Sequence, residues 1–327
     1  MRLLVLGGTA WLGGEVAAEA VRRGHEVVCL ARGESGGIPE GARLVRADRD
    51  RADAYEGAAG HWDAVVDVAR HPGHVRGAIA ALDADRWLFV STGNVYADHR
   101  RKHQDEEAAL LRPLEGDRMA SMEEYGAAKV ACEQAVVAGY GERGLVARAG
   151  LIGGPGDASG RSGWWPWRFA HPSGDAVLAP DAAGRSSQLL DVRDLAAWLV
   201  RAAEEGTGGV LDAVGPEITV GEHLETARAV AGSGAGLAVA PEAWLTEQGV
   251  EEWMGPRSLP LWLADPDRQG FTSRTGSAAR AAGLTHRPLE DTLRDVLAWE
   301  EAQPAHPHGA GLTDAEERAL LRLLAER

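Results

Sequence analysis

An α/β fold is predicted for this chain of 327 residues, as a doubly wound parallel sheet with a smaller, interleaved carboxyl-terminal lobe. The first observation is the amino terminus, where a strand-like run, a glycine-rich turn and a helical pattern follow one another. The second is the alternation of strand and helix patterns, which continues to about Arg148. After that residue glycine, proline and tryptophan become frequent, and this change predicts the start of a second lobe.

The amino-terminal unit begins with the apolar run Leu3 to Leu6, which leads directly into a glycine-rich turn. A helical pattern from Glu15 to Arg23 and a second strand from Glu26 to Leu30 follow. Glycines let the backbone approach a pyrophosphate, and the amino end of a helix offers it N–H donors. A plain tight turn is the alternative, but the placement favours a Rossmann-type dinucleotide site. Contacts with that cofactor are expected from Gly7, Thr9, Ala10, Trp11, Leu12 and Gly13.

A later apolar strand, Trp87 to Val90, ends in the hydroxyl residues Ser91 and Thr92. Open α/β sheets place their ligands at the carboxyl ends of their strands. The Thr92 hydroxyl could therefore hold a substrate oxygen, whereas the alternative role of both residues is to cap the strand end.

The stretch Tyr125-Gly126-Ala127-Ala128-Lys129 is unusual, because the chain has only four tyrosines and two lysines. Roughly 0.02 tyrosines would have a lysine four places on by chance. On a helix the two side chains share a face, where an ammonium can stabilise the phenolate of Tyr125. Tyr125 is thus a candidate proton donor, with an ordinary surface contact as the alternative.

Together these segments resemble the extended short-chain dehydrogenase/reductase family, also called the NAD-dependent epimerase/dehydratase family. The resemblance covers roughly the first 200 residues. Its elements follow the family's order: the glycine turn, Asp48 after the third strand, Asp63 to Val68, Ser91-Thr92, Tyr125 with Lys129, Arg148 to Gly156, and Gln188 to Ala196. The resemblance implies that Thr92 is the catalytic hydroxyl and Tyr125 the acid/base. It also implies that Lys129 binds the nicotinamide ribose and tunes Tyr125, and that Asp48 lies at the cofactor.

The chain departs from the family pattern in three places. Ala10 replaces the middle glycine of the turn, so weakened or shifted cofactor binding is expected. The family's asparagine after the fourth strand is replaced near His74, which leaves the proton relay open. Gly93 and Asn94 stand where sugar-nucleotide dehydratases carry an acidic pair, which argues against dehydration by that mechanism.

The choice of cofactor depends on the residue after the second strand, where a carboxylate would bind the ribose 2'-hydroxyl of NAD. This chain has Arg32 there, and no carboxylate follows until Glu34. A guanidinium suits a 2'-phosphate, so NADP(H) is favoured over NAD(H). Arg32 could instead be a solvated surface residue, with Arg49 or Arg51 in its role.

Composition narrows the partners. A net charge of −15 disfavours nucleic acid and acidic membranes, so a small-molecule substrate is expected. Cys29 and Cys132 are expected to be buried, free thiols in a cytoplasmic protein. No signal peptide or membrane span is recognised. No metal site is predicted either, because His306 and His308 are isolated and no other cluster has ligand spacing. The family resemblance suggests a homodimer.

The expected domain boundaries follow from these patterns. Residues 1–150 form the cofactor domain, to which 188–215 return through a helix and a strand. Residues 151–187 and 216–302 form the substrate lobe, with helices expected from Val220 to Ala231 and from Leu289 to Glu301. Residues 303–327 form a linker and a separate terminal helix from Thr313 to Glu326.

The second lobe is rich in tryptophan, most of which is expected in its core. Trp164 and Trp165 are predicted to line a substrate pocket, because they follow the Arg148 to Pro155 segment, which the family resemblance implies runs beside the nicotinamide. A nucleotide sugar would instead need basic groups for its diphosphate. The available ones are Arg161, Arg168, Arg185 and Arg257.

The sequence therefore favours an NADP(H)-dependent oxidoreductase that acts on a carbonyl or alcohol of a small metabolite. One alternative is a nucleotide-sugar epimerase that retains NAD. Another is a non-catalytic relative that senses NADP or binds RNA, against which the intact Thr92, Tyr125 and Lys129 argue.

Overall fold

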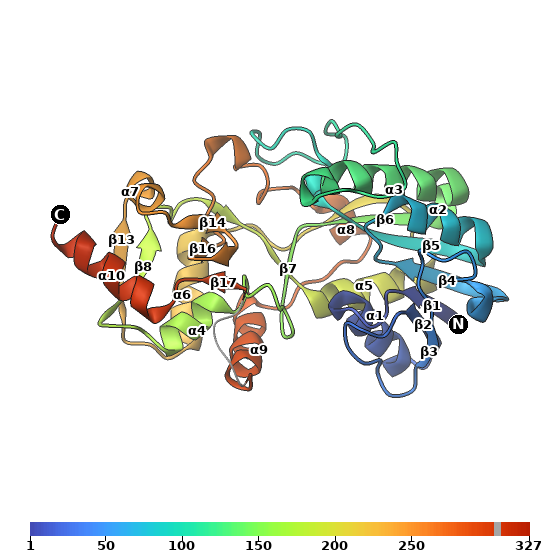
Figure 1. Cartoon of the computed structure of the whole chain (residues 1–327), viewed down its shortest axis with the longest axis horizontal. Helices are drawn as coiled ribbons and strands as arrows, with labels where there is room; N and C mark the ends of the chain where they lie inside the picture. The colour runs from blue at the N-terminus through green and yellow to red at the C-terminus, as the bar shows by residue number, and fades with distance from the viewer. Residues whose placement is uncertain (304–308) are drawn as a thin grey trace.

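The computed structural model describes residues 1–303 and 309–327. Its largest element is a seven-stranded, entirely parallel sheet with the order β11-β6-β5-β4-β1-β2-β3, seen at the right of Figure 1. The strands are β1 (Arg2–Leu6), β2 (Glu26–Ala31), β3 (Arg43–Arg46), β4 (His61–Asp67), β5 (Asp83–Thr92), β6 (Gly144–Ala149) and β11 (Gly209–Ala213). The reversal of strand order beside β1 confirms the predicted doubly wound sheet.

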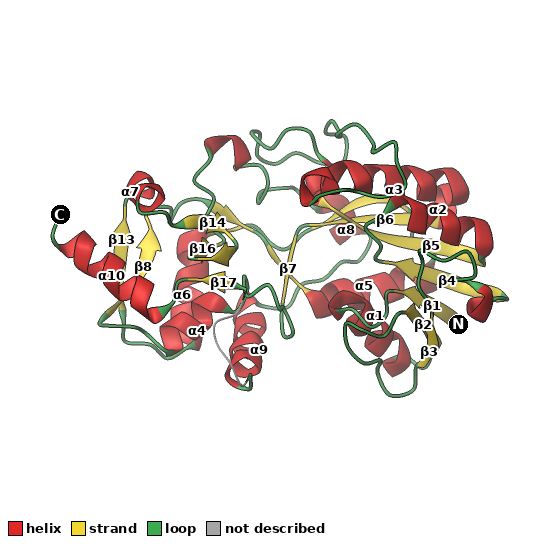
Figure 2. Ribbon diagram, viewed as in Figure 1, coloured by secondary structure: helices red, strands yellow, loops and turns green. Residues whose placement is uncertain are grey.

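Helices cover both faces of this sheet, as Figure 2 shows. They pack as two pairs, α1 with α5 and α2 with α3. Their bounds are α1 (Trp11–Arg22), α2 (Pro72–Ala81), α3 (Tyr125–Tyr140) and α5 (Val192–Glu205). Alternate residues of β1 serve the two faces, since Leu3 and Val5 join one buried cluster while Leu4 and Leu6 join the other. A strand buried on both sides must be apolar throughout, which explains the continuous run at the amino terminus.

The second lobe, at the left of Figure 1, combines short helices with two-stranded sheets. Its helices are α4 (Trp164–Ala170), α6 (Val220–Val230), α7 (Glu242–Glu247), α9 (Leu289–Glu301) and α10 (Asp314–Ala325). Its strands are β8 (Ala176–Pro180), β9 (Ser186–Ser187), β12 (Ile218–Thr219), β13 (Gly236–Ala240), β14 (Glu251–Trp253), β15 (Gly255–Pro256), β16 (Ser258–Pro260) and β17 (Ala310–Gly311). The strands β7 (Leu151–Gly153) and β10 (Leu189–Asp191) pair with each other and connect this lobe to the sheet.

The 3-10 helices are η1 (Glu56–Ala58), η2 (Gly93–Val95), η3 (Met122–Glu124), η4 (Gly141–Arg143) and η5 (Pro266–Arg268). Most predicted helices have the expected ends. Asp191 caps α5 by accepting from the Arg193 backbone N–H, and Thr219 forms a capping box with Glu222 at the start of α6.

One return of the chain to the sheet was not predicted. The short helix α8 (Ser277–Ala281) falls within the segment that the sequence assigns to the substrate lobe. Its Ala279 is fully buried, however, and joins the same cluster as Leu3 and Val5, as does Leu284 after it. The chain therefore crosses between the lobes once more than its sequence pattern indicates.

The carboxyl-terminal helix α10 begins with a capping box between Thr313 and Glu316, close to the predicted start. Its Glu317 is fully buried and accepts from the Leu178 backbone N–H and the Ser173 hydroxyl. The helix is thus part of the second lobe and not a separate tail. The predicted linker and the residues His306 and His308 lie outside the described residues, apart from the linker ends 303 and 309.

Both cysteines are buried and free, as predicted. Burial raises the pKa of the Cys29 thiol to about 11 and that of Cys132 to about 12, so neither is a reactive thiolate near neutral pH. Within the described residues, no helix is long and apolar enough to cross a membrane.

A buried histidine of α6 is expected to contribute to the pH dependence of the stability of the second lobe. His223 is completely buried, and neither ring nitrogen has a hydrogen-bond partner in the described part of the chain. Burial lowers the pKa of His223 to about 4, so the folded state keeps the ring neutral. In the unfolded chain the ring takes up a proton near its ordinary pKa, so stability is lost as pH falls from about 6.5 to about 4.

We expect His223→Leu to remove up to about 3 kcal/mol of this acid destabilisation while leaving the fold stable at pH 7. Urea unfolding between pH 7 and pH 4 measures the change. His171→Leu, at an exposed histidine of the same lobe, is the control and should leave the pH dependence unchanged. An unaltered slope in His223→Leu would contradict the expected role of His223.

Candidate active site

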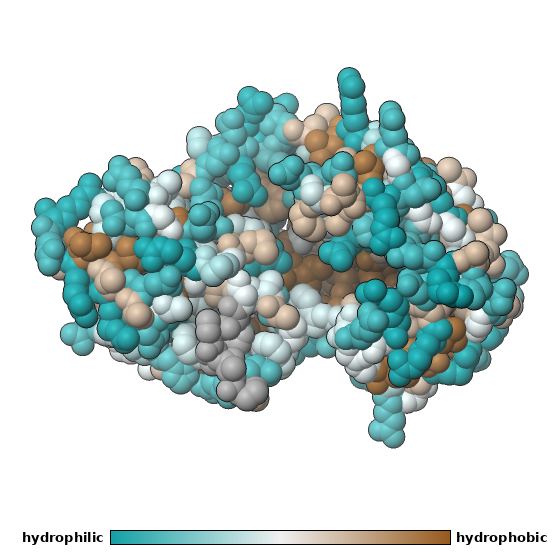
Figure 3. Space-filling view, in the orientation of Figure 1, coloured by the Kyte–Doolittle hydropathy of each residue, from teal (hydrophilic) through white to brown (hydrophobic). Residues whose placement is uncertain are grey.

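A cleft lies at the carboxyl ends of the sheet strands, between the two lobes. Figure 3 shows this hollow in the surface, with apolar residues visible at its base. The cavity has a volume of about 730 Å³. Thr92 and Tyr125 line it from the sheet domain, and Trp253 and Phe271 line it from the second lobe. Cofactor and substrate sites of doubly wound sheets lie at this edge.

The glycine turn forms one wall of the cleft. Gly7 has a φ of +97°, which favours glycine, and a Cβ on Gly13 would lie 2.2 Å from the Gly7 carbonyl oxygen. The turn is therefore closed tightly enough for helix α1 to present its amino end to the cleft. Trp11 fixes the turn to the other lobe, because its Nε1 donates to the Pro155 carbonyl at 2.8 Å.

The unusual Ala10 has φ −81° and ψ 157°, a conformation open to any residue. It lines the cleft and the neighbouring cavity that Arg32 also lines. The methyl group is therefore tolerated by the fold itself and crowds only what binds against the turn.

We expect Ala10→Gly to tighten cofactor binding about fivefold, because removing the methyl relieves crowding worth about 1 kcal/mol. It should also lower the free energy of unfolding by about 0.5–1 kcal/mol through backbone entropy. Fluorescence titration with NADPH and chemical unfolding measure the two effects. Ala18→Gly, on α1 but away from the cleft, should reproduce only the loss of stability. Unchanged or weaker binding in Ala10→Gly would contradict the expectation.

Thr92 ends β5 and is nearly buried at the base of the cleft. Its Oγ1 accepts hydrogen bonds from the Asn94 backbone N–H at 3.3 Å and from the Asn94 amide at 3.0 Å. With its oxygen engaged by two donors, the hydroxyl proton is the part left to interact with a substrate oxygen. Asn94 is thus a positioning residue, which the sequence noted only as a departure from the dehydratase pattern.

The tight packing of α3 against η2 places Tyr125 in the same cleft as Thr92. A Cβ on Gly126 would lie 2.2 Å from the Asn94 carbonyl oxygen, so α3 approaches η2 as closely as only a glycine allows. Tyr125, the first residue of α3, is half-buried and lines the cleft. Gly126 lies inside the motif that the sequence singled out, but its packing role depends on a segment about thirty residues away.

Lys129 lies one turn further along α3 and is 3% exposed. Its Nζ donates to the carbonyl oxygens of Ala69 at 2.7 Å and Val90 at 2.6 Å, and lies 6.0 Å from the centre of the Tyr125 ring. An ammonium has three N–H donors, and these two bonds leave one of them for a ligand. Backbone carbonyl groups near the carboxyl ends of β4 and β5 thus hold the Lys129 ammonium in place at the cleft.

A buried polar network supports β5 and α3 from behind. The Ser91 hydroxyl donates to Glu133 at 2.5 Å, and Arg148 donates to the same carboxylate at 2.8 Å. Arg148 also bonds the Tyr96 hydroxyl, whose pKa is raised by burial and by Asp212. Glu133 follows Lys129 by four residues, a spacing that could have been noticed in the sequence.

The predicted cofactor residues Arg32 and Asp48 line a second cavity of about 270 Å³, together with Gly7 and Thr9. The cavity lies at the ends of β1 and β2, where the adenosine half of a dinucleotide binds in such sheets. Arg32 is largely exposed and forms an ion pair with Glu34 at 3.2 Å.

The two arginines considered as substitutes for Arg32 are both paired with carboxylates, although Arg49 lines the cavity. Arg49 makes two hydrogen bonds to Asp67, at 2.8 Å and 2.9 Å. Arg51 pairs with Asp53 and does not line the cavity. A cation that sequence reasoning missed, Arg118, does line it, from a loop far along the chain.

His74 also lies at this second cavity and does not line the cleft that holds Tyr125. Its Nε2 bonds Asp50 at 2.7 Å, and Arg118 bonds the same carboxylate. These two partners hold the pKa of Asp50 well below its ordinary value. His74 is therefore a neighbour of the cofactor's adenosine side and not a member of a proton relay through Tyr125.

The prediction that Trp164 and Trp165 line the substrate pocket is wrong. They are 2% and 0% exposed, and the Trp165 Nε1 donates to the Pro260 carbonyl within the core of the second lobe. Trp253 and Phe271 line the cleft instead, with ring centres 5.5 Å apart. The sequence does not distinguish the two pairs of aromatic residues, because all four side chains are large and apolar. Only the packing of the second lobe decides which pair faces the cleft.

Three of the four basic groups named for a diphosphate are also unavailable. Arg168 is fully buried between Asp314 and Glu317, Arg185 pairs with Glu242, and Arg257 pairs with Glu316. Arg161 alone of the four lines the cleft.

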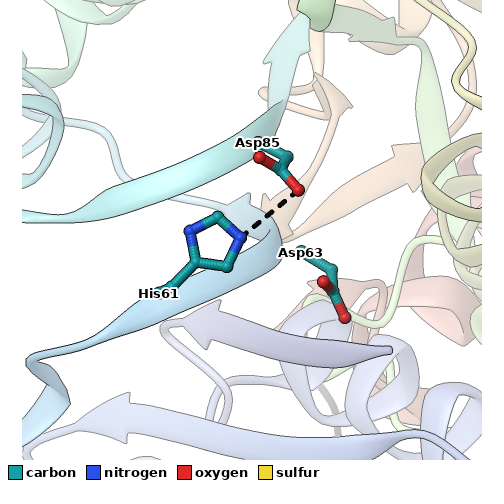
Figure 4. Close-up of side chains that lie close together, drawn as sticks. All are labelled: His61, Asp63 and Asp85. Atoms are coloured by element: carbon teal, nitrogen blue, oxygen red, sulfur yellow. Dashed lines mark hydrogen bonds and ion pairs between the residues drawn. The ribbon is translucent and has the colours of Figure 1, made fainter.

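Among the described residues, one group of side chains has a geometry that could hold a metal ion: His61, Asp63 and Asp85, drawn in Figure 4. It lies at the amino-terminal ends of β4 and β5, at the opposite edge of the sheet from the cleft. Asp63 already accepts from the Arg2 backbone N–H at 2.6 Å, and His61 bonds Asp85 at 3.3 Å. The cluster therefore has no connection with the candidate active site.

Comparison of the sequence with known proteins finds a family and a relative. The model of the NAD dependent epimerase/dehydratase family matches residues 74–213, a range that includes Thr92, Tyr125 and Lys129. A 2'-dehydrokanamycin reductase of Streptomyces kanamyceticus is 33% identical over 226 residues. This match covers 64% of the chain and 60% of the relative, so it spans less than two thirds of the relative's length.

Solved structures share the fold. UDP-N-acetylglucosamine 4-epimerase from Bacillus cereus is similar with a TM-score of 0.67 and 16% identity, over 94% of this chain and 99% of that one. UDP-glucose 4-epimerase from Thermus thermophilus, solved in complex with NAD, has a TM-score of 0.60 and 18% identity, over 93% of this chain and 100% of that one. These similarities confirm the predicted Rossmann-type fold, and the family match confirms the resemblance seen in the sequence over residues 74–213.

Proposed function

Because the chain contains a domain of the NAD dependent epimerase/dehydratase family, we propose that it is an NADP(H)-dependent oxidoreductase that interconverts a carbonyl and an alcohol on a small metabolite. The observation that carries the proposal is the meeting of Thr92, Tyr125 and Lys129 in one cleft with the glycine turn. The three side chains come from β5 and α3 and have the functional groups that a carbonyl reduction needs.

A nicotinamide cofactor would supply or accept the hydride at the substrate carbon. Tyr125 gives its proton to the substrate oxygen in reduction and takes it back in oxidation. The Thr92 hydroxyl donates a hydrogen bond to the same oxygen and holds it in place. Lys129 uses its remaining N–H toward the cofactor ribose. Gly7, Thr9, Ala10, Trp11, Leu12 and Gly13 would hold the pyrophosphate at the amino end of α1.

The preference for NADP(H) over NAD(H) is supported by Arg32 at the second cavity. Arg32 follows β2 with its guanidinium exposed, whereas Arg118, which lines the same cavity, is paired with Asp50. A 2'-phosphate would compete with Glu34 for Arg32, and a dianion binds a guanidinium more strongly than a single exposed carboxylate does.

Parallel titration of the purified protein with NADPH and NADH, followed by a screen of carbonyl compounds for NADPH oxidation, tests the proposal. Absorbance of the protein before titration shows whether a cofactor is already bound. Tight NADPH binding and oxidation with a ketone or aldehyde would support it. Resident NAD without net oxidation would indicate an epimerase, and binding of neither cofactor would indicate a non-catalytic protein.

The reductase is favoured over the nucleotide-sugar epimerase for two reasons. The relative with 33% identity is named a reductase, although its own substrate is said only of that protein. In addition, Arg168, Arg185 and Arg257 are engaged in ion pairs, so only Arg161 of the four basic groups considered for a diphosphate lines the cleft.

A further inference from the structure

The lining of the cleft is positively charged in a chain that is strongly negative. Within the described part of the chain, its charged residues are the cations Arg70, Lys129, Arg161 and Arg268 and one carboxylate, Glu123. The whole chain has a net charge of −15. A positive cleft in such a protein attracts anionic ligands and repels cationic ones.

Part of this positive charge is expected to serve the cofactor, whereas Arg161 and Arg268 line the side of the cleft that the second lobe forms. Arg70 lines both the cleft and the adenosine-side cavity, and Lys129 belongs to the catalytic set. Arg161 and Arg268 instead lie beside aromatic residues of the second lobe. The Arg161 guanidinium is 5.8 Å from the centre of the Trp253 ring, and that of Arg268 is 5.6 Å from the centre of the Phe271 ring.

Arg161 has the stronger features of a binding residue. Its Nε donates to the Ser159 hydroxyl at 3.0 Å, and no carboxylate of the described residues lies within ion-pair distance. Asp157, the nearest acid to influence it, is engaged by Ser159 and Ser162 at 2.5 Å and 2.8 Å. Burial lowers the pKa of Arg161, and Tyr125 is close enough to act on it. A desolvated guanidinium with free terminal N–H groups gains most from an anion placed against it.

The remaining surface of the substrate side is apolar. Leu111, Met122 and Met254 line the cleft although they are 36%, 61% and 50% exposed. Together with Trp253 and Phe271 they form an apolar rim drawn from both lobes. Exposed apolar groups gathered at a cleft indicate a ligand that covers them.

We propose that the substrate is a carbonyl compound, or the corresponding alcohol, with one acidic group on an apolar body. The acidic group, a carboxylate or a phosphate, binds Arg161, and the apolar body lies between the rim residues of the two lobes. This inference rests on the proposed function, because the carbonyl must lie at Thr92 and Tyr125. It excludes polycationic substrates, which Arg161 and Arg268 would repel.

Four acetophenones with a common carbonyl and ring test the charge requirement: 4-acetylbenzoate, 4-acetylphenyl phosphate, the neutral methyl 4-acetylbenzoate and the cationic 4-acetylbenzylammonium. Their dissociation constants are measured by calorimetry on protein saturated with NADP⁺, where no reduction takes place. Initial rates of NADPH oxidation are measured separately. We expect the two acids to bind at least about tenfold more tightly than the ester and the cation to bind most weakly. The acid that binds more tightly shows whether the site prefers a carboxylate or a phosphate.

Variants then test whether Arg161 causes the preference for acids. Arg161→Gln should reduce the affinity for the acids about 10- to 100-fold and leave the ester unchanged, while Arg161→Lys should retain part of the preference. Arg100→Gln, a matched loss of an exposed arginine outside the cleft, should alter nothing. Circular dichroism confirms that each variant is folded.

Two outcomes would overturn the inference: equal binding of the ester and the acids to the wild-type protein, or a preference for acids that survives Arg161→Gln. A preference for acids without NADPH oxidation by any ketone would uphold the anion site and overturn the proposed reductase. The binding and rate measurements therefore separate the failure of the inference from the failure of the function.

Discussion

Replacing Tyr125 by phenylalanine is expected to reduce kcat by about 10²- to 10⁴-fold, because the proton transfer loses its positioned donor. The aromatic ring, the packing of α3 through Gly126 and the two carbonyl contacts of Lys129 all stay in place. Cofactor affinity should therefore remain within about twofold of the wild-type value. The measurement is the rate of NADPH oxidation with the best carbonyl compound, beside a fluorescence titration with NADPH.

Tyr140→Phe is the matched control for this variant. Tyr140 is the last residue of the same helix, lies away from the cleft and packs against Trp87. Loss of the Tyr140 hydroxyl should leave both kcat and cofactor affinity unchanged. Turnover of Tyr125→Phe above about a tenth of the wild-type rate would show that another group supplies the proton.

Arg32→Ala is expected to weaken NADPH binding about 10- to 100-fold and NADH binding no more than about twofold. The reason is that only NADPH has a 2'-phosphate, which the guanidinium binds through charge-assisted hydrogen bonds. Removing Arg32 also frees Glu34, whose carboxylate then repels the phosphate. Dissociation constants of both cofactors, measured at one salt concentration, give the ratio.

Arg51→Ala tests whether any loss of nearby positive charge has the same effect. Arg51 is similarly exposed, but it pairs with Asp53 and does not line the adenosine-side cavity. Its affinities for both cofactors should match the wild type. An equal loss of NADPH and NADH affinity in Arg32→Ala would overturn the role assigned to Arg32.

The parts of the site that the sequence predicts are those with a local pattern. The turn from Gly7 to Gly13 needs only a strand, a tight turn and a helix in succession. Consecutive residues specify each of these three elements. Tyr125 and Lys129 share a helix face because four residues make about one turn. Thr92 is found at a strand end that an apolar run marks. Physical rules that act over a few residues are enough for these three features.

The parts that the sequence missed depend on contacts between distant segments. Asn94 orients Thr92, and Gly126 lets α3 approach it, only because β5 and α3 meet in the fold. Trp165 and Trp253 are alike in composition, but one packs in the core of the second lobe and the other lines the cleft. Arg161 and Arg168 are both arginines near α4, and only the contacts of Arg168 with the exposed Asp314 and the buried Glu317 distinguish them.

The sequence by itself determined the doubly wound sheet and the identity of the groups that can move a proton, because helix and strand periodicity and local spacing encode both. The tertiary structure decided which aromatic and basic residues of the second lobe face those groups. Burial and ion pairing are properties of the packed chain. The same residue type therefore packs in the core at one position and lines the cleft at another.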